Sequence, residues 1–469
     1  MKKNLVTNKK VVVMGLGLHG GGVASVKWLI KHGAQVTVTD LKSKTELKSS
    51  LDQLRGLKIK YILGKHLASD FQSTDIVIQN PGVPKESKYL KIAKKSGSLI
   101  ENDASLFLKL CPGKVIGVTG TRGKSTTATL IYEILNSKFL IQNSKVWLAG
   151  LPQQPMLAIL DRIKRNDTVV LELSSWQLEI LGEQKINPQI SMVTNIFPDH
   201  LNRYPAMQDY IEAKKKIYQF QNKDDFSIFN LDNQATKKMG SQALSKTFWF
   251  SRKFFSKHNG SFIKSKSIWF RLEGKIVKQL NLKDIKLLGQ HNLENILAAL
   301  AIAGLYNLPA NIIKKVIANF SGLPGRMELV NKANGVEYIN DTSSTIPDAT
   351  IAALSQLKGK TTILLAGGSD KNIPAKKYNE LSKLIKRKCK VVILFSGEGS
   401  DKLEKELKSL KFKHLVTKVP KMTEATILAR TYSQTGDTVL LSPACASFST
   451  FDNEFDRGDQ FNKAVGQFR

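Results

Sequence analysis

The segment GVTGTRGKST, at residues 117–126, is the feature that most restricts how this chain can fold. The apolar run KVIGV at 114–118 leads into this glycine-rich loop, and the helical pattern ATLIYEILN at 128–136 follows it. A strand, a glycine-rich loop and a helix in that order form a phosphate cradle, in which backbone N–H groups and the positive helix end surround phosphate oxygens. The segment therefore predicts a nucleoside triphosphate site within a parallel α/β sheet.

Two side chains of the loop carry the charge chemistry that such a site needs. Lys124 is placed to neutralise phosphate charge, and the Ser125 hydroxyl is placed to ligate Mg²⁺. The cradle as a whole comprises Gly120, Thr121, Arg122, Gly123, Lys124, Ser125 and Thr126.

A second glycine-rich turn follows the strand pattern at residues 10–14 and precedes a helical pattern that runs to about residue 31. The glycines at 15, 17 and 20 are followed by another strand pattern, which ends at Asp40. This order is typical of a mononucleotide-binding βαβ unit, although a purely structural turn is the alternative. A further strand, DIVIQ, ends at Asn80-Pro81-Gly82, and ligands bind at such carboxyl ends in open α/β sheets.

The length of 469 residues exceeds what a single core usually supports. Breaks near residues 111–113 and 322–325 divide the chain into three α/β domains. We predict an N-terminal Rossmann-like domain at 1–111, a central P-loop ATPase-like domain with a parallel sheet at 112–323, and a C-terminal Rossmann-like domain at 324–469. Within the central domain, residues 226–285 show short strands and turns, which we interpret as a β-rich insertion.

Composition restricts the classes of function. The formal charge of +32 comes from scattered lysines without a stacking array of aromatic residues, which favours a solvated basic surface. A nucleotide-dependent protein that binds nucleic acid remains an alternative. No apolar run approaches the roughly 18 residues of a membrane span, and three cysteines are too few for a disulfide framework or a zinc site. We expect a cytoplasmic monomer with no signal peptide, no membrane insertion and no specific nucleic-acid partner.

Further motifs complete a known pattern. Glu172 stands in ELSS after the strand TVVL, His200 in NIFPDHL and Lys214 in YIEAKKKIY, and GQHNLENILAA occupies 289–299. Together with the phosphate cradle, these motifs resemble the Mur ligases, ATP-dependent enzymes that form amide bonds in peptidoglycan precursor synthesis. The resemblance covers essentially the whole chain.

The resemblance implies a role for each motif. ATP would be bound by the cradle residues together with Asn292, Asn295, Arg326 and Asp341. The catalytic residues would be Lys124, Glu172, His200 and Lys214, and two Mg²⁺ ions would be ligated by Ser125, Glu172, His200 and Lys214. Lys214 would be carbamylated, because a carbamate offers an anionic oxygen that suits Mg²⁺, whereas an ammonium would repel it.

The stretch LSPACASFSTFDNEFDRGDQF, at 441–461, most resembles the family members that add D-glutamate to UDP-N-acetylmuramoyl-L-alanine. By this resemblance the UDP-substrate site comprises Gly17, Leu18, His19, Asp40, Asn80, Pro81, Gly82 and Ser174, and the amino-acid site comprises Thr345, Lys371, Ser447 and Phe448. The substrate carboxylate would attack the γ-phosphate to give ADP and an acyl phosphate, which the amino acid then converts to an amide.

Two departures from the family pattern keep alternatives open. Ser343 stands where many relatives carry lysine, so a Mur ligase for a different amino acid is the close alternative. Leu151 stands in a loop that usually reads GNIG, which leaves a catalytically inactive regulator on the same fold as another.

Overall fold

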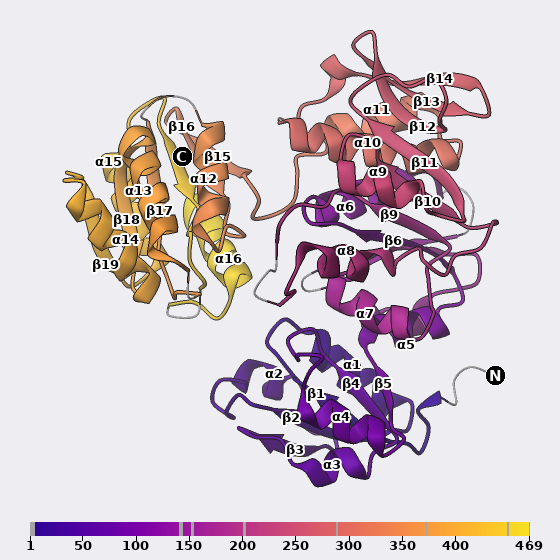
Figure 1. Cartoon of the computed structure of the whole chain (residues 1–469). Helices are drawn as coiled ribbons and strands as arrows, with labels where there is room; N and C mark the ends of the chain where they lie inside the picture. The colour runs from indigo at the N-terminus through magenta and orange to yellow at the C-terminus, as the bar shows by residue number, and fades with distance from the viewer. Residues whose placement is uncertain are drawn as a thin grey trace. The chain divides into compact units, whose positions relative to one another are not determined.

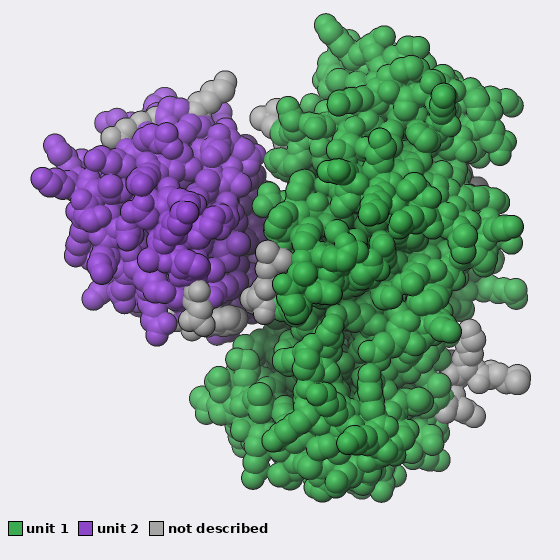
Figure 2. Space-filling view, in the orientation of Figure 1, with its two compact units in different colours: residues 1–320 green, residues 321–469 purple. Residues whose placement is uncertain are grey.

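The computed structural model describes residues 5–139, 144–151, 154–199, 203–287, 289–357, 359, 361–371, 373–447 and 450–468. The chain forms two compact units, residues 1–320 and 321–469 (Figure 2). Three β-sheets with flanking helices make up these units (Figure 1). The predicted α/β fold class is therefore confirmed, and two of the sheets lie in the first unit and one in the second.

The first sheet is entirely parallel, with the order β3-β2-β1-β4-β5. Its strands are β1 (Lys10–Met14), β2 (Gln35–Asp40), β3 (Lys60–Leu63), β4 (Ile76–Gln79) and β5 (Leu99–Glu101). The helices are α1 (Gly21–Lys31), α2 (Lys48–Asp52), α3 (Ala68–Gln72), α4 (Lys88–Lys95) and α5 (Asp103–Leu110). The strand order reverses between β1 and β4, so the loops after these two strands flank the topological switch point, where open α/β sheets bind ligands.

The second sheet has the order β14-β13-β12-β11-β10-β9-β6-β8-β7 and is parallel from β7 to β12. Its strands are β6 (Lys114–Thr119), β7 (Val146–Ala149), β8 (Thr168–Glu172), β9 (Ile190–Val193), β10 (Phe226–Asn230), β11 (Lys246–Ser251), β12 (Gly260–Lys264), β13 (Ser267–Leu272) and β14 (Lys275–Asn281). Residues 226–285 are rich in strands, but their interpretation as an insertion was wrong. They extend the central sheet, because β10 pairs in parallel with β9 and the following strands continue from β10.

Helices cover the second sheet. They are α6 (Lys124–Phe139), α7 (Ser175–Glu183), α8 (Met207–Lys215), α9 (Gln234–Gly240), α10 (Gln290–Leu305) and α11 (Ala310–Asn319), with short 3₁₀ turns η2 (Met156–Ala158), η3 (Leu160–Arg162) and η4 (Leu282–Asp284). Residues 295–304 of α10 are all buried, and α10 packs along α6. No helix in the described part of the chain is long and apolar enough to cross a membrane.

The third sheet has the order β15-β16-β20-β17-β18-β19. Its strands are β15 (Glu328–Ala333), β16 (Val336–Asn340), β17 (Thr362–Ala366), β18 (Cys389–Phe395), β19 (Leu415–Val419) and β20 (Thr438–Leu441), and its helices are α12 (Pro347–Gln356), α13 (Ala375–Lys388), α14 (Glu398–Ser409), α15 (Met422–Tyr432) and α16 (Glu454–Val465). The parallel strands β16, β17 and β20 are neighbours, so the loops after them meet at one edge.

Candidate functional site

The phosphate cradle lies where the sequence predicts it, between the end of β6 and the start of α6. Gly120 and Gly123 have φ angles of 146° and 79°. A β-carbon on Gly120 would lie 1.9 Å from Thr194 Oγ1, and one on Gly123 would lie 2.2 Å from Asn295 Oδ1. Glycine is required at both positions because side chains from two other elements press against the loop.

The segment after β9 holds the backbone of the cradle. Arg122 N donates to Asn195 Oδ1 at 2.9 Å, and Thr194 Oγ1 donates to Arg122 O at 2.7 Å. Thr121 N donates to Asn195 O at 2.9 Å. These bonds fix the backbone of the loop at the N-terminal end of α6, where the helix dipole favours an anion.

Lys214 lies inside the protein beside the cradle. Its side chain comes from the last turn of α8, only 2% of the residue is exposed, and Nζ lies 3.4 Å from Thr119 Oγ1. Burial, together with the positive charge of Lys124, holds the pKa of Lys214 well below its usual value, while Asp199 and Glu172 act in the opposite direction. The structure therefore brings Lys124, Glu172 and Lys214 together, as the sequence predicts.

Glu172 ends strand β8 and presents a buried oxygen. Its Oε2 accepts no hydrogen bond from the residues that the structure describes. A β-carbon on Gly150 would lie 2.3 Å from Glu172 O, so the loop after β7 packs closely on the glutamate backbone. A buried carboxylate oxygen without a donor suits a hard cation, so this residue fits Mg²⁺.

The other predicted residues of the ATP site lie in several places. Ser125 and Thr126 stand in the first turn of α6, and Asn295 on α10 accepts from Thr127 Oγ1 at 3.3 Å. Asn292 lies one turn earlier on α10. His200 lies outside the described residues.

In the second unit, Asp341 is a buried end-of-strand carboxylate. Ser442 Oγ donates to its Oδ2 at 2.7 Å, and Met327 N donates to its Oδ1 at 3.2 Å. Burial raises the pKa of Asp341. Arg326 is exposed in the loop before β15.

The predicted UDP-substrate residues converge at the switch point of the first sheet. Asp40 Oδ2 accepts from Leu16 N at 2.8 Å and from Gly17 N at 3.2 Å, so the carboxylate also shapes the glycine loop. The Asn80 amide donates to the carbonyl of Gly15. The remaining residues of this group lie in the same two loops, namely Leu18, His19, Pro81 and Gly82.

Ser174 has a structural role in this protein. It is the N-cap of α7, where its hydroxyl accepts from Gln177 N at 3.3 Å and Gln177 Oε1 accepts from Ser174 N at 2.9 Å. This reciprocal capping box stabilises the start of α7.

The predicted amino-acid residues gather at the carboxyl edge of the third sheet. Lys371 Nζ donates to Thr345 Oγ1 at 2.8 Å. Ser447 is buried, and its hydroxyl has no hydrogen-bond partner among the described residues. The loops after β17 and β20 pair through Ser369 and Ala446. An ammonium and an unsatisfied hydroxyl suit a carboxylate ligand. Phe448 lies outside the described residues.

Arg457 was missed by the sequence reasoning. Its side chain is fully buried in α16, where Nε donates to Thr342 Oγ1 at 3.0 Å and Nη2 donates to Thr342 O at 2.9 Å. Nη1 donates to Cys445 O at 3.3 Å. Arg457 thus joins the segment after Asp341 to the segment before Ser447. Its place in the long C-terminal stretch at 441–461 was the only sequence signal.

Comparisons with known proteins agree with this arrangement of sheets and loops. Residues 9–101 match the Mur ligase MurD-like N-terminal domain, residues 118–303 the Mur ligase middle domain, and residues 325–445 the Mur ligase glutamate ligase domain. The chain belongs to the Mur ligase family.

Within the family, the chain is similar to proteins named UDP-N-acetylmuramoylalanine–D-glutamate ligase. It is 38% identical to the one from Roseiflexus sp. (strain RS-1), over 99% of both chains. It is 36% identical to the one from Acetivibrio thermocellus, over 99% of this chain and 97% of the relative.

Solved structures share the fold. UDP-N-acetylmuramate-alanine ligase MurC from Thermotoga maritima has a TM-score of 0.61 at 19% identity, covering 98% of this chain and 99% of its own. The MurF ligase from Thermotoga maritima, solved in complex with ADP, has a TM-score of 0.53 at 18% identity, covering 99% of this chain and 97% of its own.

Proposed function

We propose that this protein is an ATP-dependent ligase that joins D-glutamate to UDP-N-acetylmuramoyl-L-alanine in peptidoglycan precursor synthesis. The observation that carries the proposal is the meeting of Lys124, Glu172 and Lys214 at the phosphate cradle. The relatives named above support the choice of both substrates.

The reaction proceeds in two steps. The carboxylate of the L-alanyl group attacks the γ-phosphorus of ATP, the bond to the β-phosphate oxygen breaks, and ADP and an acyl phosphate form. The amine of D-glutamate then attacks the acyl carbon, loses a proton, and displaces inorganic phosphate. The cradle orients the triphosphate for in-line transfer, and Lys124 stabilises the charge that spreads over the transferred group.

Four residues would hold the metal. Ser125, Glu172, His200 and a carbamylated Lys214 would supply the oxygen and nitrogen ligands of two Mg²⁺ sites. Bound Mg²⁺ would neutralise phosphate oxygens during transfer. The unpartnered Oε2 of Glu172 supports this assignment.

The carbamate would form when the neutral amine of Lys214 adds to the carbon of CO₂ and releases one proton. The lowered pKa of Lys214 supports that step, because it increases the neutral fraction of the amine.

The remaining assignments follow the same proposal. UDP-N-acetylmuramoyl-L-alanine binds the loops of the domain at 1–111, ATP binds the domain at 112–323 with Arg326 and Asp341, and D-glutamate binds the domain at 324–469. The contact of Lys371 with Thr345 and the unsatisfied hydroxyl of Ser447 support the third of these. The protein would act as a cytoplasmic monomer.

The test measures phosphate release from ATP in the presence of UDP-N-acetylmuramoyl-L-alanine, with D-glutamate compared against L-glutamate, D-aspartate and L-alanine. We expect release that depends on D-glutamate, and a product whose mass shows one added glutamate. Release with another amino acid alone would keep the chemistry and replace the amino-acid assignment. No release with any amino acid would refute the proposed activity.

A further inference from the structure

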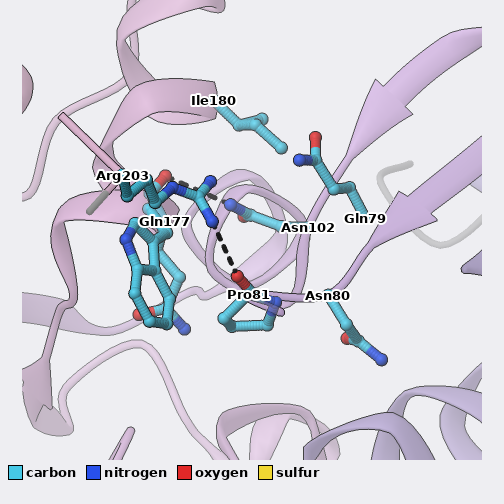
Figure 3. Close-up of a pocket in the computed structure, with 8 residues that line it drawn as sticks. Gln79, Asn80, Pro81, Asn102, Gln177, Ile180 and Arg203 are labelled. Carbon is cyan, nitrogen blue, oxygen red and sulfur yellow. Dashed lines mark hydrogen bonds between the residues drawn. The ribbon is translucent and has the colours of Figure 1, made fainter. Parts of the chain in front are cut away.

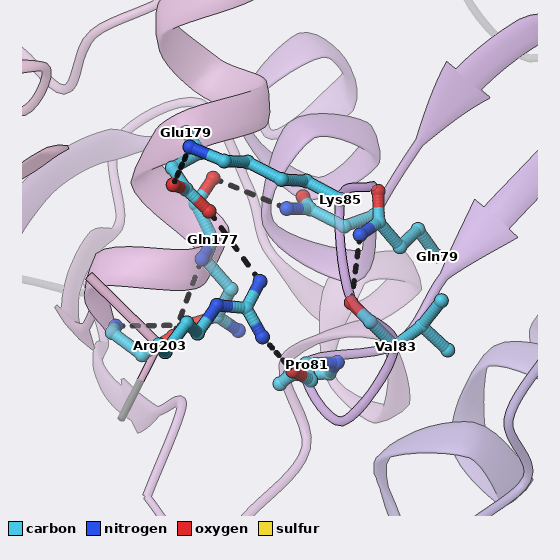
Figure 4. Close-up of polar contacts among 9 residues, drawn as sticks. Gln79, Pro81, Val83, Lys85, Gln177, Glu179 and Arg203 are labelled. Carbon is cyan, nitrogen blue, oxygen red and sulfur yellow. Dashed lines mark hydrogen bonds and ion pairs between the residues drawn. The ribbon is translucent and has the colours of Figure 1, made fainter. Parts of the chain in front are cut away.

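Arg203 stands between β9 and α8 and contacts two elements that are remote in sequence. Its Nη1 donates to Pro81 O at 3.2 Å (Figure 3), and its Nη2 lies 3.5 Å from Glu179 Oε2 (Figure 4). The guanidinium lies 4.8 Å from the ring centroid of Trp176. The side chain is only 18% exposed, so these contacts are less screened by water than those of a surface arginine.

Glu179 links the same arginine to a second residue of the first domain. Lys85 Nζ lies 3.3 Å from Glu179 Oε1, so one carboxylate bridges Lys85 and Arg203 (Figure 4). The Glu179 side chain is 15% exposed. Residues 80–85, which follow β4, are called the substrate loop below, and Arg203 and Glu179 hold this loop at both ends.

The substrate loop also borders a small pocket between the first and second sheets (Figure 3). Asn80 and Pro81 line it from the loop, Trp176 and Gln177 line it from α7, and Arg203 lies beside them. Helix α7 begins directly after the loop from Glu172, at the end of β8. A continuous path of contacts and chain therefore runs from the substrate loop through Glu179 and α7 to the carboxylate beside the cradle.

We infer that Arg203 is a positioning residue that fixes the substrate loop on helix α7. The loop then holds the UDP-substrate in the correct position relative to the phosphate cradle. This inference rests on the proposed function, because it takes the substrate loop as part of the UDP-substrate site. Arg203 acts through Pro81 and Glu179. The guanidinium suits the task because its planar donors reach a carbonyl and a carboxylate at once.

A second ion pair at the same interface provides a matched control. Lys94 on α4 lies 2.8 Å from Glu183 on α7, so it also joins the first domain to α7. The side chains of Lys94 and Glu183 are 52% and 53% exposed, and neither residue belongs to the substrate loop. If docking of the two domains were all that mattered, loss of Lys94 and loss of Arg203 would have similar effects.

The experiment compares Arg203→Met, Arg203→Lys, Glu179→Gln, the Arg203→Met/Glu179→Gln double variant and Lys94→Met in the full-length chain. We expect Arg203→Met to raise the KM for UDP-N-acetylmuramoyl-L-alanine about tenfold or more, since it loses charge-assisted hydrogen bonds. The KM values for ATP and D-glutamate should stay within about twofold in the same variant. Arg203→Lys should recover part of the loss, and Lys94→Met should leave all three KM values unchanged.

The double variant tests whether Arg203 and Glu179 act as one unit. Its KM for the UDP-substrate should rise by less than the product of the two single effects. Hydrogen exchange gives a readout without turnover, and amides of the substrate loop should exchange faster in Arg203→Met than in Lys94→Met.

Several results would overturn the inference. They are an unchanged KM for the UDP-substrate in Arg203→Met, an equal rise in all three KM values, or faster loop exchange without a change in KM. If Arg203→Met does not fold, Arg203→Lys carries the same test. If the wild-type protein shows no phosphate release that depends on D-glutamate, the proposed function is refuted instead. Hydrogen exchange in the substrate loop would still test the contacts of Arg203 with Pro81 and Glu179.

Discussion

Gly123 and Asn295 lie in direct contact, because a β-carbon on Gly123 would fall 2.2 Å from Asn295 Oδ1. Gly123 belongs to the phosphate cradle, and Asn295 is a buried residue of α10. Helix α10 is held in the core by its apolar residues, so the contact transmits the position of a core helix to the nucleotide loop.

We predict that Gly123→Ala weakens ATP binding about tenfold or more, because the methyl group displaces the loop or Asn295 and also strains a left-handed backbone. The matched control is Gly274→Ala in the β13–β14 turn, since Gly274 has a φ of 83° and no atom near its missing β-carbon. The control should lose about 1 kcal/mol of stability from backbone strain alone and keep its ATP affinity. Calorimetric titration with ATP measures the ATP affinity of both variants, and equal affinities would contradict the steric argument.

Lys214→Ala should reduce ligation by about a hundredfold or more, because the proposed Mg²⁺ ligand would be lost. Formate or acetate should restore part of the activity by supplying a carboxylate in the vacated space. Lys215→Ala is the matched control, because that neighbouring lysine makes a partly exposed pair with Glu212 at 2.8 Å. Full activity in Lys214→Ala would refute the carbamate assignment.

The same lysine should affect stability in a pH-dependent way. The folded-state pKa of Lys214 lies well below its ordinary 10.5, so between the two values the unfolded chain binds a proton that the folded chain does not. The free energy of unfolding of the wild type therefore rises with pH in this window. In CO₂-free buffer Lys214→Met should be about 1 kcal/mol more stable than the wild type at pH 7, with a difference that shrinks towards pH 10. Urea unfolding at several pH values tests this, and a difference that grows with pH would contradict it.

Arg457→Met should destabilise the protein by about 3 kcal/mol, because it leaves buried carbonyls of Thr342 and Cys445 without their donor. The KM for D-glutamate should also rise, since these carbonyls belong to segments that lead to the residues proposed to bind the amino acid. Arg387→Met on the exposed face of α13 is the control and should change stability by less than about 0.5 kcal/mol. Thermal unfolding of the full-length chain, followed with the kinetics, separates the two effects. A midpoint equal to that of the control would show that the Arg457 bonds contribute little.

The two glycine loops were predictable because local patterns define them. Each follows a short buried apolar strand, and each precedes a helix whose first turn binds anions in many folds. No local pattern marks the edge strands β15 and β19, because polar residues interrupt the apolar ones in their sequences ELVNKA and LVTKV. Residues 226–285 were interpreted as an insertion because a local sequence pattern does not show which strand pairs with which. In the structure β10 pairs with β9, so these residues extend the central sheet.

The roles of some polar side chains were predictable from the sequence, whereas the roles of others depended on the fold. Lys371 and Thr345 were predicted from the family resemblance, and the fold places them 2.8 Å apart. Ser174 and Asp40 were predicted to contact substrate, and the fold also uses them to cap a helix and to shape a loop. Arg203 and Arg457 were not predicted as functional residues, and their importance comes from carbonyls and carboxylates that other segments bring to them.

The sequence by itself determined the α/β class, the phosphate cradle and the family, because these depend on residue types at short spacing along one strand, loop or helix. Only the tertiary structure decided which strands pair, that Lys214 is buried beside Lys124 and Glu172, and that Arg203 joins the substrate loop to α7. Burial and proximity between remote residues depend on how whole elements pack. That packing sets the free-energy cost of burying a lysine or arginine side chain, and the sequence of the residue's own segment does not predict it.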